Sequence, residues 1–185
     1  MSPNGVKLCF CMVTFTVALT HCQRQTNEKS VFGMLRKNDV AGIERYLDSG
    51  GSPNIFIGSV PERKTYAVHC AAEFGRVAMC RLLYAHGADF NALDGASMTA
   101  LMVAIGRYPR DPDRLYENIQ YLLSVSNVRL TNQSGRNALH MAACSTDQRT
   151  IDLFRKLPVY DELLRCQDND GNTPEYYMLR RGFRK

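Results

Sequence analysis

The chain has 185 residues, the size of a single domain, and 45% of them are hydrophobic, which is enough for a sizeable core. A net charge of only +5 speaks against the dense basic stripe of a dedicated nucleic-acid-binding protein. The 7 cysteines show no Cys-x-x-Cys spacing, which speaks against a zinc pattern and against a compact disulfide framework.

The N-terminal part, residues 1–29, combines an apolar segment with a polar linker. Residues 8–19 read LCFCMVTFTVAL, and a lysine before them and small residues at their end fit a signal peptide cut near residue 22. The run is too short to span a bilayer. Its alternation of apolar residues with threonine fits a half-buried strand equally well, so both interpretations stay open.

From residue 30 onward the chain repeats one pattern. The clearest copy runs from His69 to Asn91: small residues and a turn glycine follow the histidine, and then come a second apolar segment and Gly-x-x-x-Asn. The position of the histidine recurs with spacings of 37, 33, 38 and 36 residues, at Phe32, His69, Met102, His140 and Tyr176. Self-similarity at this period indicates a repeat architecture.

The residue types within one copy predict two packed helices. Ala71 and Ala72 are small, which allows neighbouring first helices to approach closely. Gly75 is expected to end the first helix in a left-handed conformation, and Asn38 occupies the same place in the first copy. The second segment has apolar residues three and four positions apart, as an amphipathic helix requires.

This pattern resembles the ankyrin repeat family, whose period is about 33 residues with a T-P-L-H-x-A motif. The resemblance covers residues 30–185 and is most specific at 69–91 and at 168–174. It implies an all-α ankyrin repeat solenoid of about four helix-turn-helix repeats plus a C-terminal half-repeat, with short β-turn or hairpin loops. The expected repeats lie near 30–59, 60–93, 94–130, 131–167 and 168–185.

Two copies depart from the pattern. The third inserts YPRDPDRLY between Arg107 and Glu117, which we expect to form a surface loop because its two prolines interrupt a continuous helix. The fourth adds Pro158 to Asp161 before the next turn.

The resemblance gives the histidines a structural role. It implies that His69 and His140 bond to loop backbone, and that Gly75, Gly171 and Thr173 shape turns and helix starts. No metal site and no cofactor are expected. An enzyme using Cys70 or Cys144 is a minor alternative, because Cys70 neighbours His69 but points about 100° away from it on a helix.

Two residues before each turn position are expected to face the hollow side of the solenoid. Together with the loop around residues 60–66 they are the predicted partner contacts: Arg36, Lys37, Arg63, Lys64, Glu73, Phe74, Arg107, Ser145, Arg180 and Arg181. Phe74 is expected to have no core to pack on. Both ends of this surface are basic, so the predicted partner is another protein with an acidic surface.

The predicted function is a non-catalytic protein–protein interaction module that regulates or inhibits its partner. The ankyrin-only regulators it resembles include inhibitors of cyclin-dependent kinases, IκB-like inhibitors of transcription factors and regulators of early embryonic cell cycles. We favour a cell-cycle kinase complex; the alternatives are an IκB-like inhibitor of a transcription factor, or basic-surface binding to nucleic acid or to an anionic membrane. The resemblance implies a cytoplasmic or nuclear location, with secretion as the alternative if residues 1–22 are a signal peptide.

Overall fold

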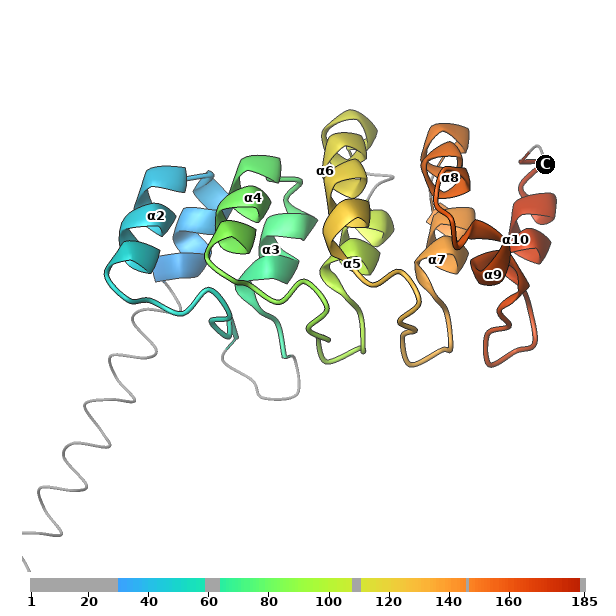
Figure 1. Ribbon diagram of the computed structural model, residues 1–185, viewed down its shortest axis with the longest axis horizontal. Helices are drawn as coiled ribbons and strands as arrows, with labels where there is room; N and C mark the ends of the chain where they lie inside the picture. Colours follow the sequence, from blue (N-terminus) through green and yellow to red (C-terminus); the bar gives the residue numbers. More distant parts are fainter. Residues whose placement is uncertain (1–29, 59–63, 108–110, 146, 184–185) are drawn as a thin grey trace, which may run out of the picture.

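The protein was analysed as a computed structural model, which describes residues 30–58, 64–107, 111–145 and 147–183. These residues form short helices stacked in pairs along one row (Figure 1). The all-α solenoid predicted from the sequence is confirmed. Within the described ranges, extended pairing is limited to two isolated bridges in the loops, Phe56 with Tyr66 and Thr131 with Asn137.

The helices form two layers. In chain order they are residues 30–37, α2 (Val40–Asp48), α3 (Ala67–Glu73), α4 (Val77–Ala85), α5 (Ala100–Arg107), α6 (Pro112–Val125), α7 (Ala138–Ser145), α8 (Gln148–Arg155), α9 (Tyr160–Arg165) and α10 (Pro174–Arg180). The first helices contact one another in the order α3, α5, α7, α10, and the second helices in the order α2, α4, α6, α8.

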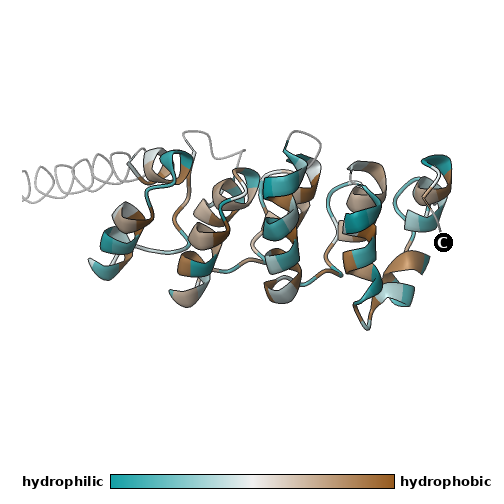
Figure 2. Cartoon of the chain, turned by 90° about the horizontal axis from the view of Figure 1, so that it is seen from above, coloured by the Kyte–Doolittle hydropathy of each residue, from teal (hydrophilic) through white to brown (hydrophobic). Residues whose placement is uncertain are grey.

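The core lies between these two layers. Small residues of the first helices, such as Ala71 and Ala142, are fully buried and allow close stacking. Large apolar residues of the second helices, such as Leu83, Ile119 and Phe154, are buried against them. Figure 2 shows hydrophilic and hydrophobic residues on the same helices, because each helix buries only one side.

Cation–π contacts join the second helices on their outer side. The Arg81 guanidinium of α4 lies 4.7 Å from the ring centroid of Tyr121 on α6. The Arg149 guanidinium of α8 lies 5.3 Å from the ring centroid of Tyr116, at the other end of α6. These outer side chains therefore already have partners within the array.

The first helices of the first two repeats, residues 30–37 and α3, each end in a tight turn. Gly75 has φ of 62° and Asn38 has φ of 60°, a left-handed backbone at corresponding positions of two repeats. A Cβ atom at Gly75 would also lie 3.0 Å from the side chain of Arg114 and 3.2 Å from that of Leu115. The turn at residue 75 thus needs glycine both for its φ and for the close approach of α6.

The prediction of a surface loop in the third repeat is largely wrong. Residues from Pro112 onward are helical, and α6 is lengthened at its N-terminus to 14 residues. Pro112 lies in the first turn, where its fixed φ suits a helix and its missing N–H is not needed. The Asp111 carboxylate caps this turn, accepting a hydrogen bond from the N–H of Arg114 at 3.4 Å.

The fourth repeat also departs from its neighbours. Asn54 and Asn91 each accept a hydrogen bond from a backbone N–H of the next repeat, at 2.8 and 2.6 Å. Arg129 occupies the corresponding position, and its guanidinium instead makes two bonds of 2.7 and 2.8 Å to the Glu162 carboxylate on α9. The residues added around Pro158 therefore lead into an extra helix that receives a different connection.

Three predicted features lie outside the described residues: the apolar segment at 8–19, the proposed cleavage near residue 22, and Arg63. Among the helices that are described, none has both the length and the apolar character needed to cross a bilayer.

Candidate protein-binding surface

His69 joins the start of α3 to the loop that follows in the next repeat. Its Nδ1 accepts a hydrogen bond from the N–H of Tyr66 at 3.2 Å. Its Nε2–H therefore faces the carbonyl oxygens of Met98 and Ala92, at 3.0 and 3.1 Å. Burial lowers the pKa of His69, so the neutral ring is the favoured form. Both ring nitrogens are used to hold backbone.

His140 has the same function two repeats later. The N–H of Asn137 donates to Nδ1 at 3.2 Å, and Nε2 lies 3.1 Å from the carbonyl oxygen of Asn172. Burial lowers the pKa of His140 as well. The two histidines bind separate loops, and no group of three or more His, Cys, Asp and Glu side chains within the described ranges could hold a metal ion.

Each of these loops is closed by one carboxylate or amide side chain. Asp94, Asn132 and Asp168 occupy corresponding positions, and the Oδ1 of each accepts hydrogen bonds from the N–H groups two and four residues later, at 2.8 to 3.1 Å. In the last loop Gly171 has φ of 78°, and the Thr173 hydroxyl accepts from the N–H of Tyr176 at 3.4 Å to cap α10.

Asp168 makes further bonds that the sequence analysis did not foresee. Its Oδ2 accepts from the Tyr177 hydroxyl at 2.7 Å and from the Arg136 Nε at 3.0 Å. Burial alone would raise the pKa of Asp168, but hydrogen bonds from Tyr177, Asn172, Arg136 and Asp170 outweigh burial and lower it to about 2. The carboxylate is therefore ionised at neutral pH.

Comparison with known proteins gives the same architecture. A family described as "Ankyrin repeats (many copies)" matches residues 68–108. Residues 68–108 therefore match ankyrin repeats. It is also 31% identical over 83 residues to the ARF GTPase-activating protein Git of Drosophila melanogaster. The aligned segment is 45% of this chain but only 11% of that protein.

Ankyrin repeats are interaction modules, and their first helices and loops present a continuous surface to a partner. Here a hollow of about 440 Å³ lies between α3, α5 and the adjoining loops. Its lining is mostly polar, and includes Thr65, His69, Glu73, Asp94, Met98, Val103, Gly106 and Arg107. Gly106 is exposed and has no side chain, which opens the hollow toward α7.

Two of the predicted contact residues bind each other across this hollow. An Arg107 guanidinium nitrogen lies 2.7 Å from a carboxylate oxygen of Glu73, with their side chains 38% and 32% exposed. The charges of Glu73 and Arg107 therefore cancel at the centre of the surface. A partner that grips Arg107 with a carboxylate has to displace Glu73 first.

The expectation that Phe74 lacks a core is wrong. Its side chain is half-buried and packs against the hydrophobic core. Its ring centroid also lies 6.2 Å from that of Phe32, which is 39% exposed on the first helix of the preceding repeat. The two rings form an aromatic contact between repeats, in which Phe32 is the more exposed ring.

The two ends of the surface are basic, as their residue types predict. Arg36 and Lys37 are exposed, and no ion pair or hydrogen bond links them to another described residue. At the other end, Arg180 is exposed and its guanidinium lies 5.8 Å from the ring centroid of Tyr176. Arg181 is also exposed but donates a hydrogen bond to the carbonyl oxygen of Cys144, which ties it to α7.

The remaining predicted contacts are less prominent. Ser145 lies half-buried at the end of α7, between the central pair and the basic C-terminal end. Lys64 is exposed in the loop before α3.

The cysteine alternative loses its chemical basis. Burial raises the pKa of the Cys70 thiol to about 12, so it carries no thiolate at neutral pH. Burial raises the pKa of Cys144 as well. Both nitrogens of His69 already bind backbone, which leaves no base for Cys70 to use.

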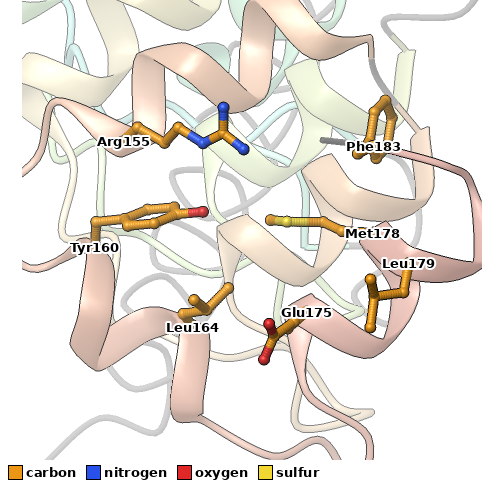
Figure 3. A pocket seen from close by; sticks show the side chains of 7 residues that line it. All are labelled: Arg155, Tyr160, Leu164, Glu175, Met178, Leu179 and Phe183. Carbon is orange, nitrogen blue, oxygen red and sulfur yellow. The ribbon is translucent and has the colours of Figure 1, made fainter. Parts of the chain in front are cut away.

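A second surface was missed by the sequence analysis. It is an apolar groove of about 230 Å³ at the C-terminal end of the array, where α8, α9 and α10 meet (Figure 3). Leu179 is 57% exposed there, although a leucine at this position of a first helix would be expected in the core. The signal in the sequence was that Leu179 stands three residues after Tyr176, as the buried Leu35 does after Phe32 and Ile105 after Met102.

Proposed function

We propose that this protein is a non-catalytic regulator that binds a partner protein on the surface of its first helices. The open hollow between α3 and α5 carries this proposal, because it is lined by polar groups and bordered by exposed charges. The rigid stack of helices keeps these groups in fixed positions, which lowers the entropic cost of binding.

The distribution of charges along this surface supports a partner with acidic patches. Arg36 and Lys37 stand at one end, Arg180 at the other, and the Glu73–Arg107 pair is neutral between them. A protein that presents two separate acidic patches, with a polar segment between them, complements this arrangement. Arginine favours such contacts because its guanidinium can bind a carboxylate with two parallel hydrogen bonds.

The identity of the partner is proposed from the resemblance alone. A cell-cycle kinase complex is the first partner to test, and an IκB-like role toward a transcription factor is the second. The GTPase-activating function in the name of Git is not proposed here, because the similarity covers 11% of that protein. A cytoplasmic or nuclear location belongs to the same proposal, and the intact mass of the mature protein would test whether residues 1–22 remain.

Affinity purification with charge-reversed variants tests the surface. The variant Arg36→Glu, Lys37→Glu, Arg180→Glu should lose a stoichiometric partner that the wild type retains. The matched control Arg45→Glu, Arg81→Glu, Arg114→Glu makes the same change of charge on α2, α4 and α6, and should retain it. Retention of the partner by the first variant, or equal loss from both, would contradict the proposal.

Salt dependence separates a protein partner from a polyanion. Binding of duplex DNA or of anionic vesicles through the basic ends should collapse between low and physiological salt, because binding releases counterions. A protein complex that also uses the Phe32 ring and the polar hollow should change much less over that range.

A further inference from the structure

The groove at the C-terminal end of the array, here called the end groove, is an apolar surface with no function so far assigned. It is lined by Arg155, Tyr160, Leu164, Glu175, Met178, Leu179 and Phe183. In Figure 3 Arg155 and Glu175 lie on opposite sides of the groove, with the side chain of Met178 between them.

The repeat alignment explains why this groove is apolar. Leu179 occupies the same position of its helix as Leu35, Ala72, Ile105 and Ala143, all of which are 0% exposed. Those four belong to first helices that are each followed by a second helix in their own repeat. No second helix follows α10 within the described residues, and Leu179 is 57% exposed.

The groove also continues an interface that is already established in the array. Second helices pack on the first helices of their own repeats, as α4 on α3, α6 on α5 and α8 on α7, and along the row on one another. The end groove is lined by side chains of α8, α9 and α10 (Figure 3), so it lies beyond α8 and against α10. Figure 1 shows α10 at the end of the row. The corresponding surface of the other first helices is covered by a second helix.

We propose that the end groove binds an amphipathic helix of a partner protein, which packs on α10 in the place of a second helix. This contact extends the proposed function, because it adds an end-on site to the one on the first helices. It does not depend on the charges of Arg36 or Lys37, so the two sites can be tested separately.

The second helices of this chain define the chemistry of the incoming helix. In α6 the buried apolar residues Leu115, Ile119 and Leu122 are spaced by four and three positions, which places them on one face. A partner helix with the same spacing would cover Leu179 and Met178. The positions that flank its apolar face would be polar, since the side chains of Arg155 and Glu175 also line the groove.

The sequence of α6 provides a defined probe. A hydrocarbon-stapled peptide of residues 112–125, with the staple joining the exposed positions 120 and 124, is pre-formed as a helix that would otherwise be marginal in water. A peptide in which Ile119 and Leu122 are replaced by aspartate has the same staple but no apolar face. Fluorescence polarisation with the full chain measures binding of both.

We expect the first peptide to bind and the aspartate peptide not to bind. Leu179→Asp in the full chain should weaken binding at least about tenfold, the effect expected for losing one buried leucine contact. Because Leu179 is exposed, this variant should keep the thermal unfolding midpoint of the wild type. The matched control Leu93→Asp changes another exposed leucine, in the loop between α4 and α5, and should bind as the wild type does.

Three outcomes would overturn the proposal. The stapled peptide could fail to bind. It could also bind Leu179→Asp as tightly as the wild type, which would mean that the peptide binds at another site, for example by displacing α6 from the array. Sedimentation could instead show a dimer of the wild type that Leu179→Asp dissociates, which would make a second copy of this chain the occupant. Charge reversal of Arg36 and Lys37 without Arg180 tests the first-helix surface independently of these results, because Arg180 lies next to Leu179 on α10.

Discussion

Two loops of this protein use the same side-chain position and are held in different ways. In the loop before α5, the Asp94 Oδ1 closes the turn, and Gln133 of the next repeat donates a hydrogen bond to the Gly95 carbonyl oxygen at 2.9 Å. In the loop before α10, the Asp168 Oδ1 closes the turn in the same way. Its Oδ2 additionally binds Arg136 and Tyr177.

The difference shows how the last repeat is held. An interior loop has neighbours on both sides, so repeated backbone contacts fix it. Within the described residues the last loop has a neighbour only on the side of residues 132–136, and a buried carboxylate connects it to that neighbour and to α10. Interior repeats are stabilised by contacts with the next repeat. The last repeat is stabilised instead by the network of Asp168, Arg136 and Tyr177.

The largest difference in stability is expected between variants that lack the carboxylate of Asp168 and those that lack the carboxylate of Asp94. Asp168→Ala leaves two loop N–H groups, the Tyr177 hydroxyl and the Arg136 guanidinium without their acceptor, and should lower the free energy of unfolding by about 3 kcal/mol. Asp94→Ala removes only the loop bonds and should cost about 1.5 kcal/mol. Urea unfolding of both variants measures the gap, and equal losses would show that the network adds nothing.

The contrast should depend on pH. The pKa of Asp168 is about 2 in the folded protein, below the value of about 3.9 for an unperturbed aspartate. Ionised Asp168 therefore stabilises the fold above about pH 4, and this contribution, about 2 kcal/mol, is lost as the pH falls toward 2. Unfolding of the wild type and of Asp168→Asn between pH 6 and pH 2 should show their difference shrinking as the pH falls; a constant difference would argue against the ionised network.

A single hydroxyl contributes a smaller share. Tyr177→Phe removes the bonds of the hydroxyl to Asp168 and Arg136, of 2.7 and 2.8 Å, and should cost about 1 kcal/mol. Tyr176→Phe is the matched control on the same helix, because among the described residues the hydroxyl of Tyr176 is bound to the exposed Arg180 alone, at 3.4 Å. Similar losses in thermal unfolding of the two variants would remove Tyr177 from the network.

The smallest change in stability is expected for the ion pair on the α3–α5 surface, which lies away from both loops. Arg107→Ala removes the ion pair with Glu73, whose side chains are both about one-third exposed, and should change stability by no more than about 0.5 kcal/mol. A loss as large as that of Asp168→Ala would mean that the hollow between α3 and α5 is needed for folding rather than for binding.

Local rules predicted much of this architecture. Gly75 and Asn38 have the left-handed backbone expected of a helix-ending turn, and His69 binds loop backbone as the family resemblance implies. These features depend on residues close in sequence or on a repeated motif, so one chain is enough to infer them.

Long-range pairings could not be inferred in the same way. The Glu73–Arg107 pair, the Phe32–Phe74 contact and the Arg129–Glu162 pair each join residues of different repeats. Which of several charges or rings meet depends on the offset between stacked helices, and a period that varies between 33 and 38 residues does not fix that offset. Pro112, taken for part of a loop, proved to begin α6, although a cap at Asp111 followed by proline is a local signal for the start of a helix.

The sequence alone determined that tandem helix pairs stack in a row, because small alanines, turn residues and apolar faces recur at one period and no pair can bury its apolar side alone. Only the tertiary structure decided which side chains face a partner. Arg107 is neutralised by Glu73, Phe74 is taken up by the core, and Leu179 is left exposed. Exposure and pairing are properties of neighbours in space, and neighbours in space follow from how the repeats are stacked.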